Sequence, residues 1–348
     1  MEQIVIDEVV IPPSVDLPEA ADFVAAIGVR NAVESHGYGM DDVVFTPAEV
    51  LPAYLNLEFE PKRMFVARLG GDVVARAVYE TLADPESTHA WFTIQVRPEF
   101  RGRGVGSALH ELLEGLAKAD GITEAVVYAV SRPGPGERID SPTGFGSVPR
   151  DNPEVRFLLH RGYRLEQIER GSRLALPAVL PEAPETPGYG IRQWVGVTPE
   201  RWVDDLATLR TRMSTDAPSA GLDEPEDVWT AERVRAQDEH AGDGGRTLLV
   251  TAVEHLASGR LAGYTELVAP AEATRVVEQR DTIVLREHRG HRLGMLLKVA
   301  NLAQLERVVP GRPSVLTFNA EENRHMLDVN EAIGFTPIGY EGAWKKHL

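Results

Sequence analysis

The chain has 348 residues, which is more than one ordinary hydrophobic core accommodates and fits two domains. It contains no cysteine, so disulfides, thiolate metal sites and a cysteine nucleophile are excluded. The formal net charge of −17 argues against nucleic acid or an anionic membrane as the main partner and would suit a cationic substrate. Because no apolar run approaches the length of a membrane-spanning helix and the start "MEQIVIDEVVIPP" lacks a basic region before an apolar one, we expect a cytoplasmic protein.

The first half of the chain predicts an alternation of helices and strands. An amphipathic helical region at about 17–36 precedes a hairpin at 63–82 and a strand, "WFTIQV", that ends at Val96. The next helix places its apolar residues three and four positions apart, at Val105, Ala108, Leu109, Leu112, Leu113 and Leu116. A strand at 124–130, a short helix ending in a glycine–aromatic pair, and a closing strand within "EQIERGSRLAL" follow.

The second half repeats this order. It predicts a helical region at 198–213, a hairpin at 246–267, a strand at 281–285, a helix after it, a strand at 314–318 and a closing strand within "PIGYEGAWK". The intervening stretch "LPAVLPEAPETPGYG" is rich in proline and has no periodicity, which is typical of a linker. We therefore predict two duplicated α/β domains, at 1–176 and 190–348, joined by a linker at 177–189.

One stretch in each copy combines glycine with arginine directly after a strand: "VRPEFRGRGVG" at 96–106 and "VLREHRGHRLG" at 284–294. A strand, a tight glycine turn and a helix leave backbone N–H groups without partners at the start of the helix, where the helix dipole adds positive charge. Gly102, Gly104 and Gly106 let a ligand approach that backbone, and Arg101 and Arg103 add full charges. The pattern predicts a site for a phosphate or pyrophosphate, or alternatively a helix start whose arginines simply face water.

Two common phosphate motifs do not fit this stretch. The dinucleotide pattern G-x-G-x-x-G fails because Ser107 stands where its third glycine would be, and no Gly-Lys-Ser or Gly-Lys-Thr completes a P-loop. What remains is R-x-x-G-x-G after a strand. With "VRPEFRGRGVGSALHELL", the preceding "FTIQV" and the later "YAV", the sequence resembles the GNAT superfamily of acyl-CoA-dependent N-acyltransferases.

The resemblance extends over both halves, and the tandem arrangement is similar to that of the mycothiol synthases. It implies two GNAT-like domains, each a mixed, largely antiparallel sheet flanked by helices, with acetyl-CoA as the acyl donor. In that family two strands splay apart and the pantetheine arm lies in the gap. The implied cofactor-binding residues are Ile94, Val96, Arg101, Gly102, Arg103, Gly104, Val105, Gly106 and Ser107 in the first copy, and Val284, Arg289, Gly290, Arg292, Gly294, Asn319 and Asn323 in the second.

Both copies depart from the family pattern. Arg292 replaces the first motif glycine of the second copy, which narrows the approach to the backbone but adds a charge. The family tyrosine that protonates the departing thiolate is replaced by Leu158 in one copy and Asn330 in the other, so water would have to deliver that proton. The first copy also has an insertion at 131–150, either a surface loop or a segment that shapes an acceptor pocket.

Acetylation of an amine requires a base, and two carboxylates occupy matching positions before the splayed strands. Glu80 in "VYETL" and Glu266 in "YTELV" are the candidate bases, although a solvated glutamate is the commoner interpretation of a carboxylate at such a strand position. His288 and His291 have metal-like spacing but no apparent third ligand, so we expect no metal.

The sequence thus favours an N-acetyltransferase acting on a primary amine of a small, polar, cationic acceptor by direct transfer in a ternary complex. A non-catalytic CoA-binding or assembly protein on a duplicated scaffold is the alternative, and one active copy beside one structural copy joins the two. Transfer of an aminoacyl group from tRNA conflicts with the net charge and with the lack of a basic stripe. We expect no nucleic acid or membrane partner, while the acceptor's identity, which copy is catalytic, whether the second copy binds CoA, and the oligomeric state, a homodimer included, stay open.

Overall fold

A computed structural model describes residues 3–84, 86–240 and 242–348. The chain divides into two compact units, and each consists of more than one segment. The first contains Met1–Glu169, Ala220–Pro225 and Gly339–Leu348, and the second contains Arg170–Ser219 and Glu226–Ile338. Residues 339–348 therefore belong to the first unit, whereas the domain boundaries predicted at 176 and 190 place them in the second domain.

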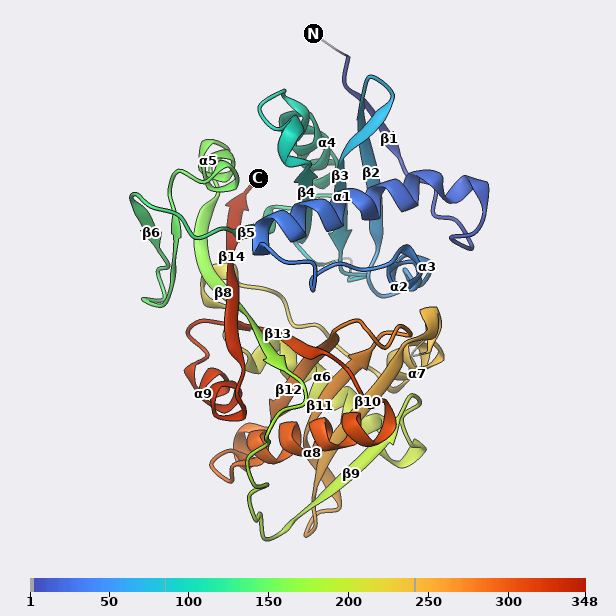
Figure 1. The fold of residues 1–348 in the computed structure, drawn as a ribbon, viewed down its shortest axis with the longest axis vertical. Coiled ribbons are helices and arrows are strands. Elements are labelled where there is room, and N and C mark those ends of the chain that lie inside the picture. The colour runs from blue at the N-terminus through green and yellow to red at the C-terminus, as the bar shows by residue number, and fades with distance from the viewer. Residues whose placement is uncertain (1–2, 85, 241) are drawn as a thin grey trace. The chain divides into compact units, whose positions relative to one another are not determined.

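The first unit is a mixed, largely antiparallel sheet with helices on both faces, as predicted (Figure 1). Its strands lie in the order β1 (Val5–Glu8), β2 (Lys62–Leu69), β3 (Asp72–Thr81), β4 (His89–Val96), β5 (Glu124–Ser131), β14 (Thr336–His347) and β8 (Arg164–Ala175). Its helices are α1 (Ala21–Tyr38), α2 (Pro47–Val50), α3 (Pro52–Leu55), α4 (Val105–Ala119) and α5 (Pro153–His160).

Alternation along β2 explains why both faces of this sheet are covered. Met64 and Val66 pack in one cluster with residues of α1, while Phe65, Ala67 and Leu69 pack in another with residues of α4. Successive strand residues point to opposite faces, so an uninterrupted apolar run such as "MFVA" supplies two cores at once. The two helices thereby enclose the strands that carry the candidate site.

The C-terminal strand of the chain completes the first sheet. β14 pairs antiparallel with β5, with Tyr340 opposite Ser131 and His347 opposite Glu124. Trp344 of this strand is 1 % exposed and belongs to the core cluster of the first unit. The closing strand predicted for the second copy is present, but residues Gly339–Leu348 serve the first unit.

The insertion at 131–150 is an ordered hairpin. Its strands β6 (Arg138–Asp140) and β7 (Ser147–Pro149) form a separate two-stranded sheet. Val148 is buried in the first unit's core, and the Asn152 side chain donates to the Arg132 carbonyl at 2.9 Å. The insertion is thus fastened near its end by Val148 and at its beginning by the bond from Asn152 to Arg132.

The second unit repeats the same layers. Its strands follow the order β8, β13 (Ser314–Ala320), β12 (Val277–Val284), β11 (Arg260–Ala269), β10 (Thr247–His255) and β9 (Tyr189–Val195). Its helices are α6 (Val203–Asp216), α7 (Ala231–Glu239), α8 (Leu293–Val308) and α9 (Arg324–Ile333). Short 3-10 turns occur in both units, at Pro18–Ala20, Pro98–Phe100, Glu200–Trp202, Ala220–Leu222, Asp243–Gly245 and Arg286–His288.

The spacing of Leu293, Leu296, Leu297, Ala300 and Ala303 predicts an apolar face for helix α8, and the buried face differs from it. Ala303 is exposed, whereas Lys298, Asn301 and Gln304 are buried. Asn301 and Gln304 donate to strand carbonyls, at 3.2 Å and 3.0 Å, and both accept from Thr251. Hydrogen bonds of this kind compensate the cost of burying amide groups. Polar residues that the apolar pattern places on the outer face of the helix can therefore lie on its buried face.

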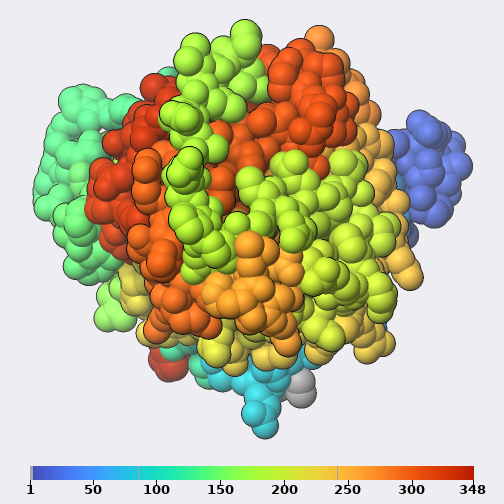
Figure 2. All heavy atoms as spheres, turned by 90° about the horizontal axis from the view of Figure 1, so that it is seen from below, coloured from blue at the N-terminus to red at the C-terminus, as the bar shows by residue number. Residues whose placement is uncertain are grey.

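The proline-rich segment after β8 has no helix or strand until Tyr189. Leu176, Ala178 and Leu180 pack against a core cluster of the second unit, while Val179 between them is 98 % exposed. Its yellow-green atoms lie on the surface of the face shown in Figure 2. The segment is therefore extended and held by every second side chain.

Candidate functional site

The glycine–arginine turn of the first copy joins β4 to α4. Gly102 has φ +75° and Gly104, the residue before the helix, has φ +87°. Both values lie in the left-handed region, which glycine adopts without the steric cost that a side chain brings. This requirement accounts for the glycines and leaves the first N–H groups of α4 facing outward at the end of β4.

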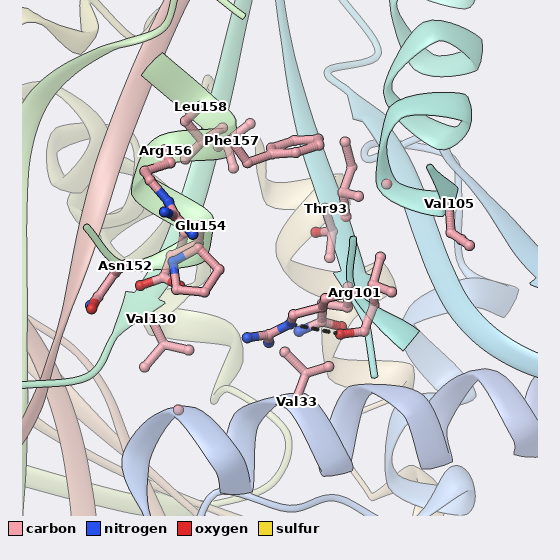
Figure 3. Close-up of a pocket in the computed structure, with 18 of the residues that line it drawn as sticks. Val33, Thr93, Arg101, Val105, Val130, Asn152, Glu154, Arg156, Phe157 and Leu158 are labelled. Atoms are coloured by element: carbon pink, nitrogen blue, oxygen red, sulfur yellow. Dashed lines mark hydrogen bonds between the residues drawn. The ribbon is translucent and has the colours of Figure 1, made fainter. Parts of the chain in front are cut away.

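The two arginines of this turn have different positions. Arg101 donates from Nε to the Val96 carbonyl at 3.2 Å and lines a cavity (Figure 3). Arg103 donates to the Glu99 carbonyl at 3.4 Å, stacks over Phe100 and is not among the residues that line the cavity. Arg101 therefore supplies the positive charge that the cavity sees from this turn.

The cavity has a volume of about 580 Å³ and opens between two strands that diverge. β4 and β5 pair in parallel only at their beginnings, from His89 opposite Glu124 to Trp91 opposite Val126. Beyond that point, residues 93–96 of β4 and 127–130 of β5 both line the cavity. The splayed strands that the family resemblance implied are therefore present, and Ile94 and Val96 lie on the wall of the gap.

Eight of the nine cofactor residues predicted in the first copy line this one cavity: Ile94, Val96, Arg101, Gly102, Gly104, Val105, Gly106 and Ser107. Helix α5 forms another wall with Phe157 and Arg161. The Arg161 guanidinium lies 3.8 Å from the centre of the Phe157 ring and donates to the Ser107 hydroxyl at 2.5 Å. Leu158, which stands at the family's tyrosine position, also lines the cavity.

This surface fits an acyl-CoA in its chemistry. Outward N–H groups and a guanidinium suit a pyrophosphate. A slot between strand backbones, lined by Ile94, Val96 and Val130, suits an apolar arm with amide groups. A methyl group at Gly106 would lie 3.2 Å from Phe157, so the absence of a side chain keeps this entrance open.

The inner wall of the cavity carries a carboxylate that the sequence alone did not single out. Glu34 of α1 lines the cavity and accepts from Gln95 Nε2 at 2.5 Å. Gln95 in turn accepts from Arg76 Nε at 2.6 Å, and both of these side chains are buried. Burial raises the pKa of Glu34, against the opposing charges of Arg30 and Arg76.

A second carboxylate lies behind the first. Glu341 of β14 accepts from the Tyr38 hydroxyl, and Tyr38 stands one helical turn after Glu34. Burial, reinforced by the charge of Glu34, raises the pKa of Glu341 to about 7. Glu34 lies in the helix predicted at 17–36 and Glu341 in a predicted closing strand, and neither is part of a recognisable sequence motif. The pairing of β14 with β5 brings the two glutamates together.

Further along β5 the cavity is bordered by Tyr128. Its hydroxyl donates to Glu224 at 3.3 Å, and Glu224 also accepts from Trp91 Nε1 at 3.0 Å. Burial, with Glu224 and Glu169 nearby, raises the pKa of Tyr128. Within the first unit, the 220–225 segment therefore adds a carboxylate beside β4 and β5.

The two predicted bases lie elsewhere. Glu80 forms an ion pair with Lys62 at 3.0 Å and is not among the lining residues of the cavity. Glu266 is 4 % exposed and pairs with Arg210 at 2.7 Å. Both carboxylates are thus paired with cations, Glu80 with Lys62 of β2 and Glu266 with Arg210 of α6, and strand alternation does not reveal these partners.

The turn of the second copy has the same backbone but a different occupant. Arg289 donates from Nε to the Val284 carbonyl at 3.1 Å, as Arg101 does to Val96. Its other guanidinium nitrogen pairs with Asp216 at 3.0 Å, and Arg286 pairs with the same carboxylate at 3.0 Å. Gly290 and Arg292 have φ +86° and +58°, and Gly294 lies in the first turn of α8.

The remaining predicted residues of the second copy are engaged locally. The Asn323 side chain caps α9 by accepting from Met326 N at 3.4 Å, and Asn319 accepts from Asn330 at 2.7 Å. His288 accepts or donates at Tyr189, 3.0 Å away, and His291 stacks beside the same tyrosine. Across the described residues, no group of three or more histidine, cysteine or acidic side chains is arranged to hold a metal ion. In that same part of the chain, every helix is too short or too polar to cross a membrane.

Residues 35–134 match the acetyltransferase (GNAT) family. A search of curated proteins finds no match. Among solved structures, a tandem GNAT protein from the clavulanic acid biosynthesis pathway is 24 % identical with a TM-score of 0.73, covering 99 % of this chain and 98 % of its own. A GCN5-related N-acetyltransferase from Sphaerobacter thermophilus is 17 % identical with a TM-score of 0.63 (99 % and 95 % covered), and an acetyltransferase-like protein from Pyrococcus horikoshii is 10 % identical with a TM-score of 0.56 (99 % and 89 %). At these identities the structures show a shared fold.

Proposed function

We propose that the chain is a tandem member of the GNAT superfamily and an N-acetyltransferase whose first unit binds acetyl-CoA and acetylates a primary amine. The observation that carries the proposal is the cavity, which joins the Arg101–Ser107 turn to the gap between β4 and β5. The turn would hold the pyrophosphate and the gap the pantetheine arm, so the thioester would reach the inner wall.

The acceptor we propose is a small, polar, cationic amine. Glu34 lines the inner wall, and Glu224 bonds to Tyr128 beside it, while the chain as a whole carries a net charge of −17. Opposite charge raises the local concentration of a cation and holds it before it loses its proton. The acceptor's ammonium group gives one proton to a base, its nitrogen bonds the thioester carbonyl carbon, the C–S bond breaks, and the thiolate takes the second proton.

We assign no acyl-CoA to the second unit in this proposal. Arg286 and Arg289 of its turn are already paired with Asp216. The duplicated copy then has a structural role, which includes the strand β14 that completes the first sheet.

A combined binding and turnover experiment tests the proposal. Calorimetry with CoA should give binding that Gly106→Trp abolishes, because the new side chain would occupy the space against Phe157. A panel of amines assayed for CoA release should show turnover with cationic acceptors that falls as salt increases. CoA binding without turnover of any amine would favour the non-catalytic alternative, and CoA affinity unaltered by Gly106→Trp would place the ligand elsewhere.

A further inference from the structure

We infer that Glu34 is the base that takes the proton from the acceptor amine, and that Glu341, carried on the last strand of the chain, positions it. The inference rests on the proposed acetyltransferase function. It makes the first unit's active site dependent on residues from the far end of the chain.

Glu34 occupies the place that a base requires. It is on the wall of the cavity at the end of the gap where Thr93 and Gln95 of β4 face α1. Glu154 also lines the cavity, but it accepts from Ser131 at 2.8 Å and lies where the charge of Arg101 acts on it. Glu154 is therefore on the phosphate side, and Glu34 is the carboxylate on the acyl side.

The surroundings of Glu34 fix its orientation. Arg76 can only donate, so the oxygen of the Gln95 amide faces Arg76 and its NH₂ group faces Glu34. The chain Arg76–Gln95–Glu34 therefore holds one carboxylate oxygen of Glu34 in place. A guanidinium two hydrogen bonds away balances part of the charge without forming an ion pair that would quench a base.

Glu341 acts on Glu34 through space and through α1. Tyr38 and Glu34 are four residues apart on α1 and so lie on one helix face. The Tyr38 hydroxyl donates to Glu341, which brings the second carboxylate beside the first. Two neighbouring carboxylates in a partly buried site resist ionising together, so the pair titrates in two separate steps.

The titration of this pair depends on groups from each neighbouring element. Arg30 and Tyr38 lie on α1, Arg76 on β3 and Gln95 on β4. Glu169 of β8 acts on Tyr38, and Tyr128 of β5 lies within the influence of Glu341. Burial raises the pKa of both carboxylates and Arg30 lowers both, while the charge of Glu34 raises the pKa of Glu341 further.

Glu341 reaches this position because β14 belongs to the first sheet. Glu341 is opposite Val130, and Val130 lines the cavity. A methyl group on Gly37 would lie 2.3 Å from the Val130 side chain, which shows how closely α1 approaches β5 at this level. The tandem arrangement thus serves catalysis in the first unit by delivering a strand with a carboxylate.

Steady-state kinetics of Glu34→Gln and Glu341→Gln test the inference, with Glu111→Gln as the matched control on the exposed face of α4. Glu34→Gln should lower kcat by a factor of about 100 or more, while CoA affinity measured by calorimetry stays within about twofold. Glu341→Gln should remove from the acid limb of the kcat/KM profile the ionisation near pH 7 that belongs to Glu341, because the two carboxylates titrate as a pair and the variant leaves one. The control should retain the rate and profile of the unsubstituted protein.

Each contrary outcome has a distinct meaning. If the unsubstituted protein is active and the Glu34→Gln variant keeps its kcat, Glu34 is not the base. If kcat falls in the Glu80→Gln variant instead, Glu80 is the base, as the sequence suggests. A uniform fall in rate for Glu341→Gln, with the acid limb unmoved, would reduce Glu341 to a structural residue. CoA binding with no turnover of any amine by the unsubstituted protein would overturn both the acetyltransferase function and this inference.

Discussion

Arg289 and Asp216 form an ion pair at 3.0 Å in the second unit, at the position where Arg101 of the first unit faces the cavity. The two arginines make the same bond to the last residue of the preceding strand, at 3.1 Å and 3.2 Å. Because the two turns have the same backbone hydrogen bond, they differ in the partner of the arginine guanidinium group. In one turn the partner is a carboxylate from α6, and in the other the guanidinium is directed at the cavity.

We expect one CoA per chain for this reason. Arg101→Ala should weaken CoA binding by about 10- to 100-fold, the range for losing a charge-assisted hydrogen bond. Arg289→Ala should leave the affinity within about twofold, because its charge is already used by Asp216. Calorimetric titration measures both stoichiometry and affinity, and two equivalents of CoA per chain would contradict the prediction.

The residue before each helix gives a second contrast between the turns. Arg292 has φ +58° and is exposed, a conformation that costs a residue with a side chain about 1 kcal/mol. Arg292→Gly should therefore raise the free energy of unfolding of the second unit by about 1 kcal/mol. The reciprocal Gly104→Arg should destabilise the first unit by a similar amount and lower CoA affinity by at least about tenfold, because Gly104 has φ +87° beside the cavity. Thermal unfolding with and without CoA measures both effects, and a destabilising Arg292→Gly or a stabilising Gly104→Arg would contradict the strain argument.

The local elements and the phosphate turn could be predicted because their signals are short-range. A glycine turn after a strand, followed by leucines at helical spacing, lies within about 20 residues. The inner wall could not be predicted in this way. Glu34 and Glu341 are brought together by the pairing of β14 with β5. The residues of "PIGYEGAWK" do not indicate that this strand pairs with a strand of the first copy rather than with one of the second.

The surroundings of Glu80 have a related cause. The end of its strand predicts a position near the cleft, and the register of β3 against β4 sets it opposite Trp91. Its pairing with Lys62 depends on the register of β2 against β3, where the two residues are directly opposite. The sequence alone does not give the register of the hairpin, so it does not distinguish a free carboxylate that could act as a base from one that forms an ion pair with the opposite strand.

The exchanged strand predicts a stability effect that crosses the chain. Trp344 lies far along the sequence from the first unit, yet it is buried in that unit's core. Trp344→Ala should destabilise the first unit by about 3–5 kcal/mol, the usual cost of removing a large buried aromatic side chain. His347→Ala, an exposed position on the same strand, is the matched control and should change stability by less than about 0.5 kcal/mol.

Scanning calorimetry identifies the affected unit, because CoA should raise only the transition of the unit that binds it. The Trp344→Ala protein should lower that transition and leave the other in place. A chain that ends at residue 176 should likewise fail to give the CoA-sensitive transition, since it lacks residues 339–348. If Trp344→Ala instead lowers the transition that does not respond to CoA, Trp344 does not stabilise the unit that binds CoA, and the prediction is wrong.

The carboxylate pair predicts how stability changes with pH. The pKa of Glu341 is raised from its ordinary value of 4.5 to about 7 in the folded chain, first by burial and then by the charge of Glu34. A carboxyl whose folded pKa is raised binds more protons in the folded state, so its stabilising contribution is complete below about pH 4.5 and is lost as pH rises through about 7. Between these limits the first unit should lose on the order of 2 kcal/mol that the Glu341→Gln variant does not lose. Urea unfolding of both proteins at pH 5 and pH 8 measures the difference, and the variant should gain on the unsubstituted protein at the higher pH. Parallel pH dependence of the two proteins would show that Glu341 ionises as an ordinary surface carboxylate, and the pair could then not tune a base.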